Sequence, residues 1–274
     1  MKIKYLGTAA AEAIPALFCT CETCREARKA GGRELRLRSQ ALINDTLLID
    51  LNGDTAANAQ RFGLDMTRVF HCLITHVHSD HFCVPEFFYV SPGFTHRDGM
   101  PPLTVHGSED VAEALEKSVA AAKGALVCRF EPPFAPFDAG GVRVTALKAS
   151  HGIPHPYIYL LEQDGKSILY AHDTGPFPEE TWDYLGRSNV RLSLVSLDCN
   201  DGDVDDIEYD GHMCVGRCKR VRDRLKSLGI ADESAVFVLN HFSHNGVRTL
   251  YRDMSKIAER EGFIASYDGL ELTV

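Results

Sequence analysis

The sequence lacks any apolar stretch approaching the roughly 20 residues that a helix needs to cross a bilayer. Its first residues, MKIKYLGTAA, contain no long apolar core followed by a cleavage site, so they do not resemble an export signal. From these two absences we expect a soluble, cytoplasmic protein that has no membrane partner.

Positive charge is also scarce, with 29 Lys and Arg against 38 Asp and Glu and a formal net charge of −9. An acidic surface repels nucleic acid and anionic lipid, so the composition argues against a general polyanion binder and leaves only a local basic pocket open. Repeats, low-complexity tracts and linkers rich in Pro, Gly or Ser are absent as well. Since 45% hydrophobic content suffices for a sizeable core, we expect a single domain over residues 1–274.

Cysteine is present, but in an odd number. Three of the nine cysteines crowd into residues 19–24. Without an export signal, free thiols and metal ligation are better explanations than disulfides.

The remaining pattern predicts a mixture of strands and helices. Short apolar runs bounded by turn residues predict strands at 2–7, 39–44, 46–51, 68–75, 125–130, 141–149, 157–163, 166–173, 191–198, 234–241 and 271–274. Helical periodicity with capping residues predicts helices at 55–63, 108–124, 178–187, 213–229 and 247–262. Mixed sheets covered by helices on their outer faces fit this order.

The segment ITHVHSDHF, residues 74–82, holds three histidines and an aspartate within six positions at the end of a predicted strand. Side chains two apart on an extended segment point the same way, so His76 and His78 can share one metal ion. Asp80 and His81 lie just beyond, where a turn can aim them at a second ion. A polar surface turn is the simpler alternative, but the H-x-H-x-D-H spacing favours a metal site.

Further ligand-type residues stand at the ends of three other predicted strands. His151 follows the strand at 141–149, and Asp173 and His241 close the strands at 166–173 and 234–241. This recurrence makes a coincidence of unrelated polar residues a poor explanation.

The motif THVHSDH, followed by a His, an Asp and a His at successive strand ends, resembles the metallo-β-lactamase superfamily over essentially the whole chain. The resemblance implies an α+β fold, the four-layer αββα sandwich, with a two-metal site at one edge of its sheets. It also implies which residues bind the metals: His76, His78 and His151 at the first, Asp80, His81 and His241 at the second, and Asp173 between them.

The segment FCTCETC arranges Cys19, Cys21 and Cys24 as C-x-C-x2-C, and NHFSHNG offers His244 as a fourth ligand for a closed zinc site. Unrelated thiols are the alternative. The cysteine cluster, together with SQALIN, THVHSDH, LDCN, GHMC and NHFSHNG, resembles the PhnP family of phosphodiesterases. That resemblance implies a structural zinc on these four residues and activity on cyclic ribose phosphates.

The same resemblance assigns to His212 a contact with substrate phosphate or protonation of the leaving group. Without the resemblance, a lone histidine at the start of a helix is more often a capping or surface residue. His155, close to His151, either touches substrate or caps a strand. The acidic stretch at 198–210 is a departure, and acidic charge near an entrance disfavours a highly charged phosphate substrate.

The function expected is hydrolysis of a small phosphodiester by a hydroxide that bridges two divalent metals, with His212 and Asp80 as catalytic residues. The active-site metals are expected to be zinc or manganese, with iron as a third candidate, and the cysteine site to hold zinc. A lactone or thioester hydrolase is the alternative. A tRNA 3′-processing nuclease and a non-catalytic binding module rank lower, because the chain is acidic and the ligand set is complete. The expected partner is a small molecule, nucleic acid is not expected, and a homodimer is left open.

Overall fold

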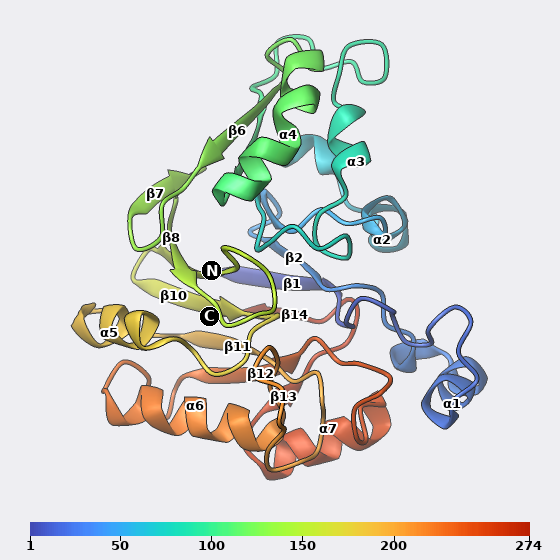
Figure 1. The fold of residues 1–274 in the computed structure, drawn as a ribbon, viewed down its shortest axis with the longest axis vertical. Helices are drawn as coiled ribbons and strands as arrows, with labels where there is room; N and C mark the ends of the chain where they lie inside the picture. The colour runs from blue at the N-terminus through green and yellow to red at the C-terminus, as the bar shows by residue number, and fades with distance from the viewer.

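The computed structural model describes residues 1–274 and contains two seven-stranded sheets that lie face to face (Figure 1). The first sheet has the order β14 (Glu271–Thr273), β1 (Lys2–Gly7), β2 (Gln40–Ile43), β3 (Leu47–Ile49), β4 (His71–Leu73), β5 (Leu103–Gly107) and β6 (Leu126–Phe130). The second has the order β13 (Ile264–Ala265), β12 (Val236–Asn240), β11 (Leu194–Asp198), β10 (Lys166–Ala171), β9 (Tyr157–Gln163), β8 (Val142–Lys148) and β7 (Pro136–Ala139).

Helices cover the outer face of each sheet. The first sheet carries α2 (Thr55–Phe62), α3 (Val84–Phe88) and α4 (Glu109–Ala121), and the second carries α5 (Glu179–Arg187), α6 (Val215–Ser227) and α7 (Tyr251–Arg260). Two single 3₁₀ turns, Gly32–Glu34 and Met66–Arg68, lie in the connections. Helix α1 (Glu22–Ala30) projects to one side, at the blue end of the chain in Figure 1.

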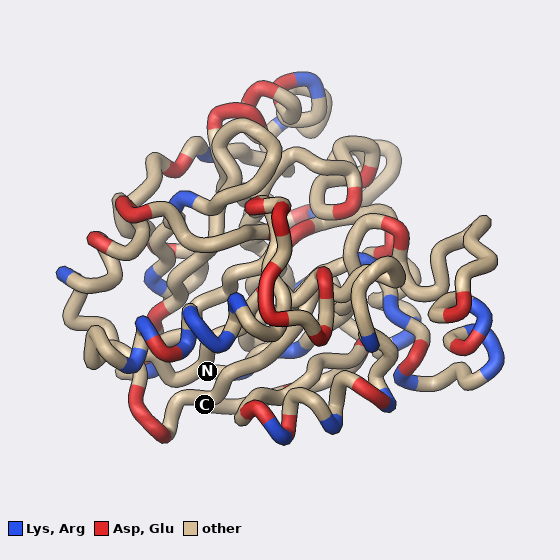
Figure 2. Tube along the Cα trace, turned by 60° about the horizontal axis from the view of Figure 1, so that its bottom comes forward, with Lys and Arg blue, Asp and Glu red and all other residues tan.

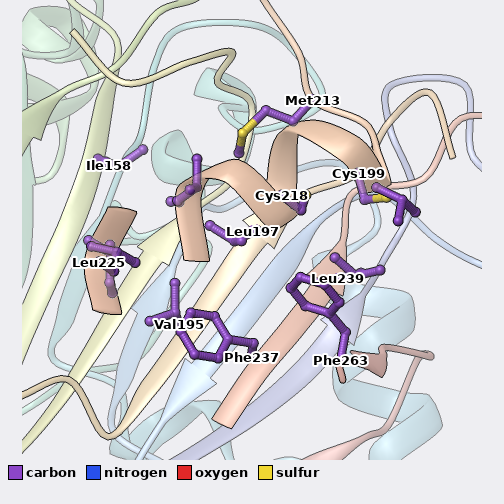
Figure 3. Packing of buried hydrophobic residues seen from close by; sticks show 14 of the residues in the cluster. Ile158, Val195, Leu197, Cys199, Met213, Cys218, Leu225, Phe237, Leu239 and Phe263 are labelled. Carbon is purple, nitrogen blue, oxygen red and sulfur yellow. The ribbon is translucent and has the colours of Figure 1, made fainter. Parts of the chain in front are cut away.

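Three separate apolar cores account for the four layers, because strands bury alternate side chains on opposite faces. In β3, Leu47 and Ile49 belong to the core between the two sheets, whereas Leu48 belongs to the core under α2–α4. The third core lies between the second sheet and α5–α7. Figure 3 shows part of it, where Cys218 and Leu225 of α6 lie over Leu197 and Val195 of β11.

The observed order confirms the predicted α+β four-layer sandwich, and every predicted strand and helix has a counterpart. Boundaries differ: the strand predicted at 68–75 is only β4, because a 3₁₀ turn precedes it and the ligand loop follows. The sequence reading missed β5, β7, β13, α1 and α3. These elements have two to nine residues, and their patterns are too short to show a period.

The sheet topology places several strand ends at one edge. Strands β3, β4 and β5 are mutually parallel, as are β10, β11 and β12, so their carboxyl ends meet at the same side. Strand β8 runs in the direction of β10, since each pairs antiparallel with β9 between them. The polar residues that follow these strands therefore collect at one edge of the sandwich.

Candidate metal centre

The first group of ligand-type side chains comes from the loop after β4 and from the segment after β8. His76 Nε2 lies 2.9 Å from His78 Nδ1, and His151 Nε2 lies 3.1 Å from the same His78 nitrogen. Asp173, which follows β10, approaches with its Oδ2 3.2 Å from His76 Nε2. One point can therefore be reached by all four side chains, as the implied first metal site requires.

The second group lies beside the first and shares Asp173 with it. His81 Nε2 is 3.0 Å from Asp173 Oδ2 and 3.2 Å from Asp80 Oδ2. His241, after β12, brings its Nε2 to 3.2 Å from Asp173 Oδ1, and its ring centre lies 5.4 Å from that of His81. The structure groups His241 with Asp173, Asp198 and His212 more closely than with Asp80 and His81.

Asp173 occupies the centre of the whole cluster. Its Oδ2 faces His76 and His81, and its Oδ1 faces His241 at 3.2 Å and His151 at 3.6 Å. Its backbone is in the left-handed region, with φ 52°, and His241 shares that conformation with φ 62°. Non-glycine residues adopt it at a cost, and such strain concentrates at functional sites.

Two carboxylates that the sequence reading missed stand behind the ligands. Asp50, directly after β3, accepts a hydrogen bond at Oδ2 from His81 Nδ1 over 2.7 Å. Asp198, the last residue of β11, lies with Oδ2 3.1 Å from His212 Nδ1 and accepts hydrogen bonds from the backbone of Asp173 and Met213. The rule that found Asp173, an acidic residue at the end of an apolar strand, would have found both.

Hydrogen bonds on the outer side of the cluster use one nitrogen of His81 and one of His151, and leave the nitrogen that faces the centre of the cluster free to bind a metal. His81 donates Nδ1–H to Asp50, and His151 donates Nδ1–H to the carbonyl oxygen of Gly211 over 3.0 Å, so each points its Nε2 toward the cluster. His81 Nε2 and Asp173 Oδ1 are buried atoms without a hydrogen-bond partner. A buried set of facing acceptors is costly unless a cation lies between them, so these residues fit a divalent metal.

The pKa shifts of Asp173 and His76 agree with binding of a divalent metal at the cluster. Burial disfavours a charge on Asp173, but His241, His76 and His81 around it hold the pKa of its carboxyl well below the usual range. Burial and the neighbouring His81 lower the pKa of His76 to about 4, so that this histidine is neutral and able to bind metal at pH 7. Burial opposes protonation of His81 as well, but Asp50 and Asp80 raise its pKa well above the ordinary value, so this histidine must release a proton when it binds a metal.

A cavity of ≈ 300 Å³ opens over the cluster and is lined in part by His78, Asp80, His151, His212 and His241. The His212 ring stacks on that of His241, with centres 5.7 Å apart. Burial disfavours its charge, but Asp198 and Asp173 outweigh this effect and raise the pKa of His212 to about 9. His212 therefore lies at the wall of the cavity beside carboxylates that favour its protonated form.

His155 does not join the cluster. Its Nδ1 lies 2.9 Å from Asp110 Oδ2 and its Nε2 lies 3.2 Å from Glu109 Oε1, at the first turn of α4. It does not line the cavity described above. Of the two roles considered for His155, its position matches a local structural contact and not a contact with substrate over the metals.

The cysteine cluster meets His244 as the spacing suggested. His244 Nδ1 lies 3.7 Å from Cys19 Sγ and 3.5 Å from Cys21 Sγ, and the three sulfurs and this nitrogen form one compact group. Backbone N–H groups of Cys21, Cys24 and Ala16 point at the three sulfurs, and no disulfide forms. Burial opposes ionisation of Cys21, but hydrogen bonds from Cys24 N–H and from His244 lower its pKa to about 6. Burial and the neighbouring Cys21 raise the pKa of Cys24 to about 12 instead. Three sulfurs and a histidine nitrogen in one compact group suit a structural zinc, which would displace the remaining thiol protons.

Residues 46–241 match the sequence profile of the family described as "Beta-lactamase superfamily domain". The chain belongs to the β-lactamase superfamily. Members of this superfamily are largely metal-dependent hydrolases, and the cluster of histidines and aspartates is the divalent-metal site of this β-lactamase-fold chain. No curated protein sequence matches the chain.

Solved structures of low identity share the β-lactamase superfamily fold. A diphosphatase of the PhnP family is 18% identical with a TM-score of 0.72, and the match covers 99% of this chain and 97% of that one. Zinc-bound PqqB from Methylobacterium extorquens is 16% identical with a TM-score of 0.76, over 100% of both chains. The short form of human tRNase Z is 17% identical with a TM-score of 0.66, over 100% of this chain and 99% of that one. No helix of this superfamily member has the length and apolar character needed to cross a membrane.

Proposed function

We propose that the chain is a dinuclear metal-dependent phosphodiesterase that hydrolyses small phosphodiesters, cyclic ones included. The position of Asp173 carries the proposal. Each of its oxygens faces one histidine of the first implied set and one of the second, His76 and His81 at Oδ2 and His151 and His241 at Oδ1, so that a single carboxylate contacts both sets of ligands. The PhnP-family diphosphatase supports the choice of phosphate chemistry.

The residues that would hold the two cations are the sets implied by the resemblance: His76, His78 and His151 for one, Asp80, His81 and His241 for the other, with Asp173 shared. The first set forms one compact group with Asp173, and Asp80 and His81 form another, to which His241 is connected through Asp173. Bound divalent ions of zinc, manganese or iron supply Lewis acidity and lower the pKa of a water molecule. Asp50 holds His81 in orientation, and the Gly211 carbonyl does the same for His151. The Cys3His group would hold a zinc ion with a structural role.

His212 acts as the general acid in this scheme. It lines the cavity, and its Nδ1 lies 3.1 Å from Asp198 Oδ2, which supports the protonated ring. A proton on His212 can pass to the departing oxygen, which matters most when that oxygen belongs to a poor leaving group.

The test compares two aryl phosphodiesters that differ only in leaving group, p-nitrophenolate and phenolate. We expect His212→Ala to keep its metals and to lose roughly 100-fold or more of kcat on the phenyl ester, but much less on the p-nitrophenyl ester. His155→Ala removes a histidine outside the cavity and serves as the control. Equal losses on both esters, or no loss, would contradict the role of His212.

Parallel assays with a lactone and a thioester address the proposal as a whole, because the same ligands can serve a carbonyl electrophile. Turnover of either in preference to phosphodiesters would replace our proposal by the alternative.

Nuclease activity on tRNA is not proposed, since basic residues alternate with acidic ones in the view of Figure 2 and form no continuous basic face there.

A further inference from the structure

The walls of the metal cavity carry no lysine or arginine. Outside the implied ligands, His212 is the one lining side chain able to bear a positive charge. Enzymes that bind phosphate groups of high charge surround them with arginine and lysine. In this cavity the bound metal ions would have to offset most of the negative charge of a phosphate.

The carboxylates around the metals limit the negative charge that a bound substrate can carry. Asp80 and Asp173 lie among the ligands, and Asp50 and Asp198 lie directly behind them. Their four negative charges equal the positive charge of two divalent cations. A phosphodiester with one negative charge fits this balance better than a phosphate with two or more.

The acidic stretch at 198–210 contributes no carboxylate to the lining of the cavity, and only part of its charge is paired. Asp206 and Asp210 both contact Arg217, at 2.8 Å each, and Asp203 lies 3.1 Å from Arg248. The carboxylates of Asp201, Asp205 and Glu208 contact no lysine or arginine, so the stretch keeps part of its negative charge.

Glu12 is different, because it is an exposed carboxylate that lines the cavity and has no cationic partner in the chain. The nearby Arg38 is already engaged, with Nη1 2.9 Å from Asp54 Oδ1 and Nε 2.8 Å from the carbonyl oxygen of Ala11. The exposed charge of Glu12 is thus available to a ligand.

The backbone that carries Glu12 is fixed against the metal centre. Ala10 N–H donates to the Phe242 carbonyl oxygen over 2.9 Å, and Phe242 N–H donates to the Thr8 carbonyl oxygen over 3.0 Å. Phe242 follows the implied ligand His241 directly. The backbone two residues before Glu12 therefore keeps a set position relative to the metals, so the Glu12 side chain projects from a fixed base beside the cavity.

We propose that Glu12 selects phosphodiesters in which one esterified alcohol carries a cationic ammonium group, so that the substrate is a zwitterion with a single phosphate charge. This assignment rests on the proposed phosphodiesterase function and names its substrate class. The phosphate lies over the metals, and the ammonium group lies toward Glu12 at the mouth of the cavity.

Binding of reaction products tests the assignment without turnover. Phosphocholine and 3,3-dimethylbutyl phosphate have the same shape and the same phosphate, and only the first has a cationic nitrogen. By calorimetry on the metal-loaded protein, we expect phosphocholine to bind roughly 3- to 10-fold more tightly than its isostere, the range for a partly exposed charge pair. In Glu12→Gln the two should bind equally, whereas Glu113→Gln, which removes an exposed carboxylate on α4, should keep the preference.

Equal binding of the two compounds to the parent protein, or a preference that survives in Glu12→Gln, would overturn the assignment. Tighter binding of glycerol 3-phosphate than of phosphocholine would also overturn it, because Glu12 would then accept hydrogen bonds from hydroxyl groups and not pair with a cation.

Turnover separates this inference from the function on which it rests. We expect kcat/KM on bis-p-nitrophenyl phosphate, which has one negative charge, to exceed that on dianionic p-nitrophenyl phosphate by about 10-fold or more. Failure to hydrolyse any phosphodiester would remove the proposed function. Hydrolysis of bis-p-nitrophenyl phosphate without the charge and ammonium preferences would remove only the inference about Glu12.

Discussion

Asp50 illustrates at the scale of single residues how a side chain that touches no substrate can control a metal site. It is fully buried, its Oδ2 accepts a hydrogen bond from His81, and its Oδ1 accepts hydrogen bonds from the backbone and hydroxyl of Thr75. The carboxylate is thereby fixed in place, and it fixes the tautomer and the ring orientation of His81 in turn.

We predict that Asp50→Asn lowers the affinity for the active-site metals by roughly 10- to 100-fold, because the amide no longer stabilises the proton on His81 Nδ1. Competition with a chelator of known affinity measures the effect. Asp45→Asn changes an aspartate on the adjacent hairpin turn, which pairs only with Lys2 at the surface, and should leave metal affinity unchanged. The same metal affinity in Asp50→Asn and the parent protein would show that Asp50 does not support His81.

At the scale of elements, the segment from Asp198 to α6 folds across the end of the second sheet and carries His212. Arg217 of α6 holds it from one side through Asp206, Asp210 and the carbonyl oxygens of Tyr209 and His212. On the other side the segment packs directly on the turn after Asp173. A Cβ at Gly175 would lie 1.8 Å from the carbonyl oxygen of Asp210.

We predict that Gly175→Ala displaces this segment and with it His212. The expected result is a fall of about 10-fold or more in kcat on the phenyl ester, with a loss of roughly 1–3 kcal/mol in unfolding free energy from overpacking. Gly53→Ala is the matched control, since a Cβ there meets nothing within 4 Å. Unchanged turnover in Gly175→Ala would mean that the segment yields without moving His212.

The short helix α1 also belongs to this scale. Cys21 is its N-cap and accepts a hydrogen bond at sulfur from the N–H of Cys24, so the first turn of the helix is part of the thiolate cluster. The sequence predicted no helix at Glu22–Ala30, because Cys21 is not one of the Ser, Thr, Asp and Asn residues that are typical of an N-cap.

At the scale of the whole molecule, the cysteine cluster joins distant parts of the chain. Cys19, Cys21 and Cys24 lie near the amino end and meet His244, which lies three residues beyond the implied ligand His241. A zinc ion here would fix the projecting α1 segment to the loop that carries an active-site ligand.

We predict that Cys24→Ser removes one zinc per chain and lowers the unfolding free energy by at least roughly 3 kcal/mol, because zinc bound only by the folded state stabilises it. Metal analysis and urea unfolding measure the two effects. Cys128→Ser, on β6, lies outside every ligand group and should keep the zinc. A Cys24→Ser protein with full zinc content would exclude the cluster as a zinc site.

Several expectations about the whole protein stay predictions. The single domain over 1–274, the cytoplasmic location, the small-molecule partner, the low affinity for nucleic acid and the open question of a homodimer are tested by none of the contacts described above. The two ends of the chain meet in the fold, because the amino group of Met1 donates a hydrogen bond to the Val274 carbonyl oxygen over 2.7 Å.

The sequence by itself determined the ligand types, the fold class and most of the strands. His76, His78, Asp80 and His81 stand within six residues, and a strand end followed by a ligand is a local pattern, so both are visible without coordinates. The alternation of apolar residues that placed the longer strands is equally local, because it depends only on the two-residue period of extended backbone.

Only the tertiary structure decided which side chains share a point in space and which do not. It separated His155 from the cavity, joined His212 to Asp198, paired Asp206 and Asp210 with Arg217, and left Glu12 at the mouth without a partner. Each of these outcomes depends on distances between residues far apart in the chain. Such distances follow from how sheets and helices pack, which no local pattern encodes.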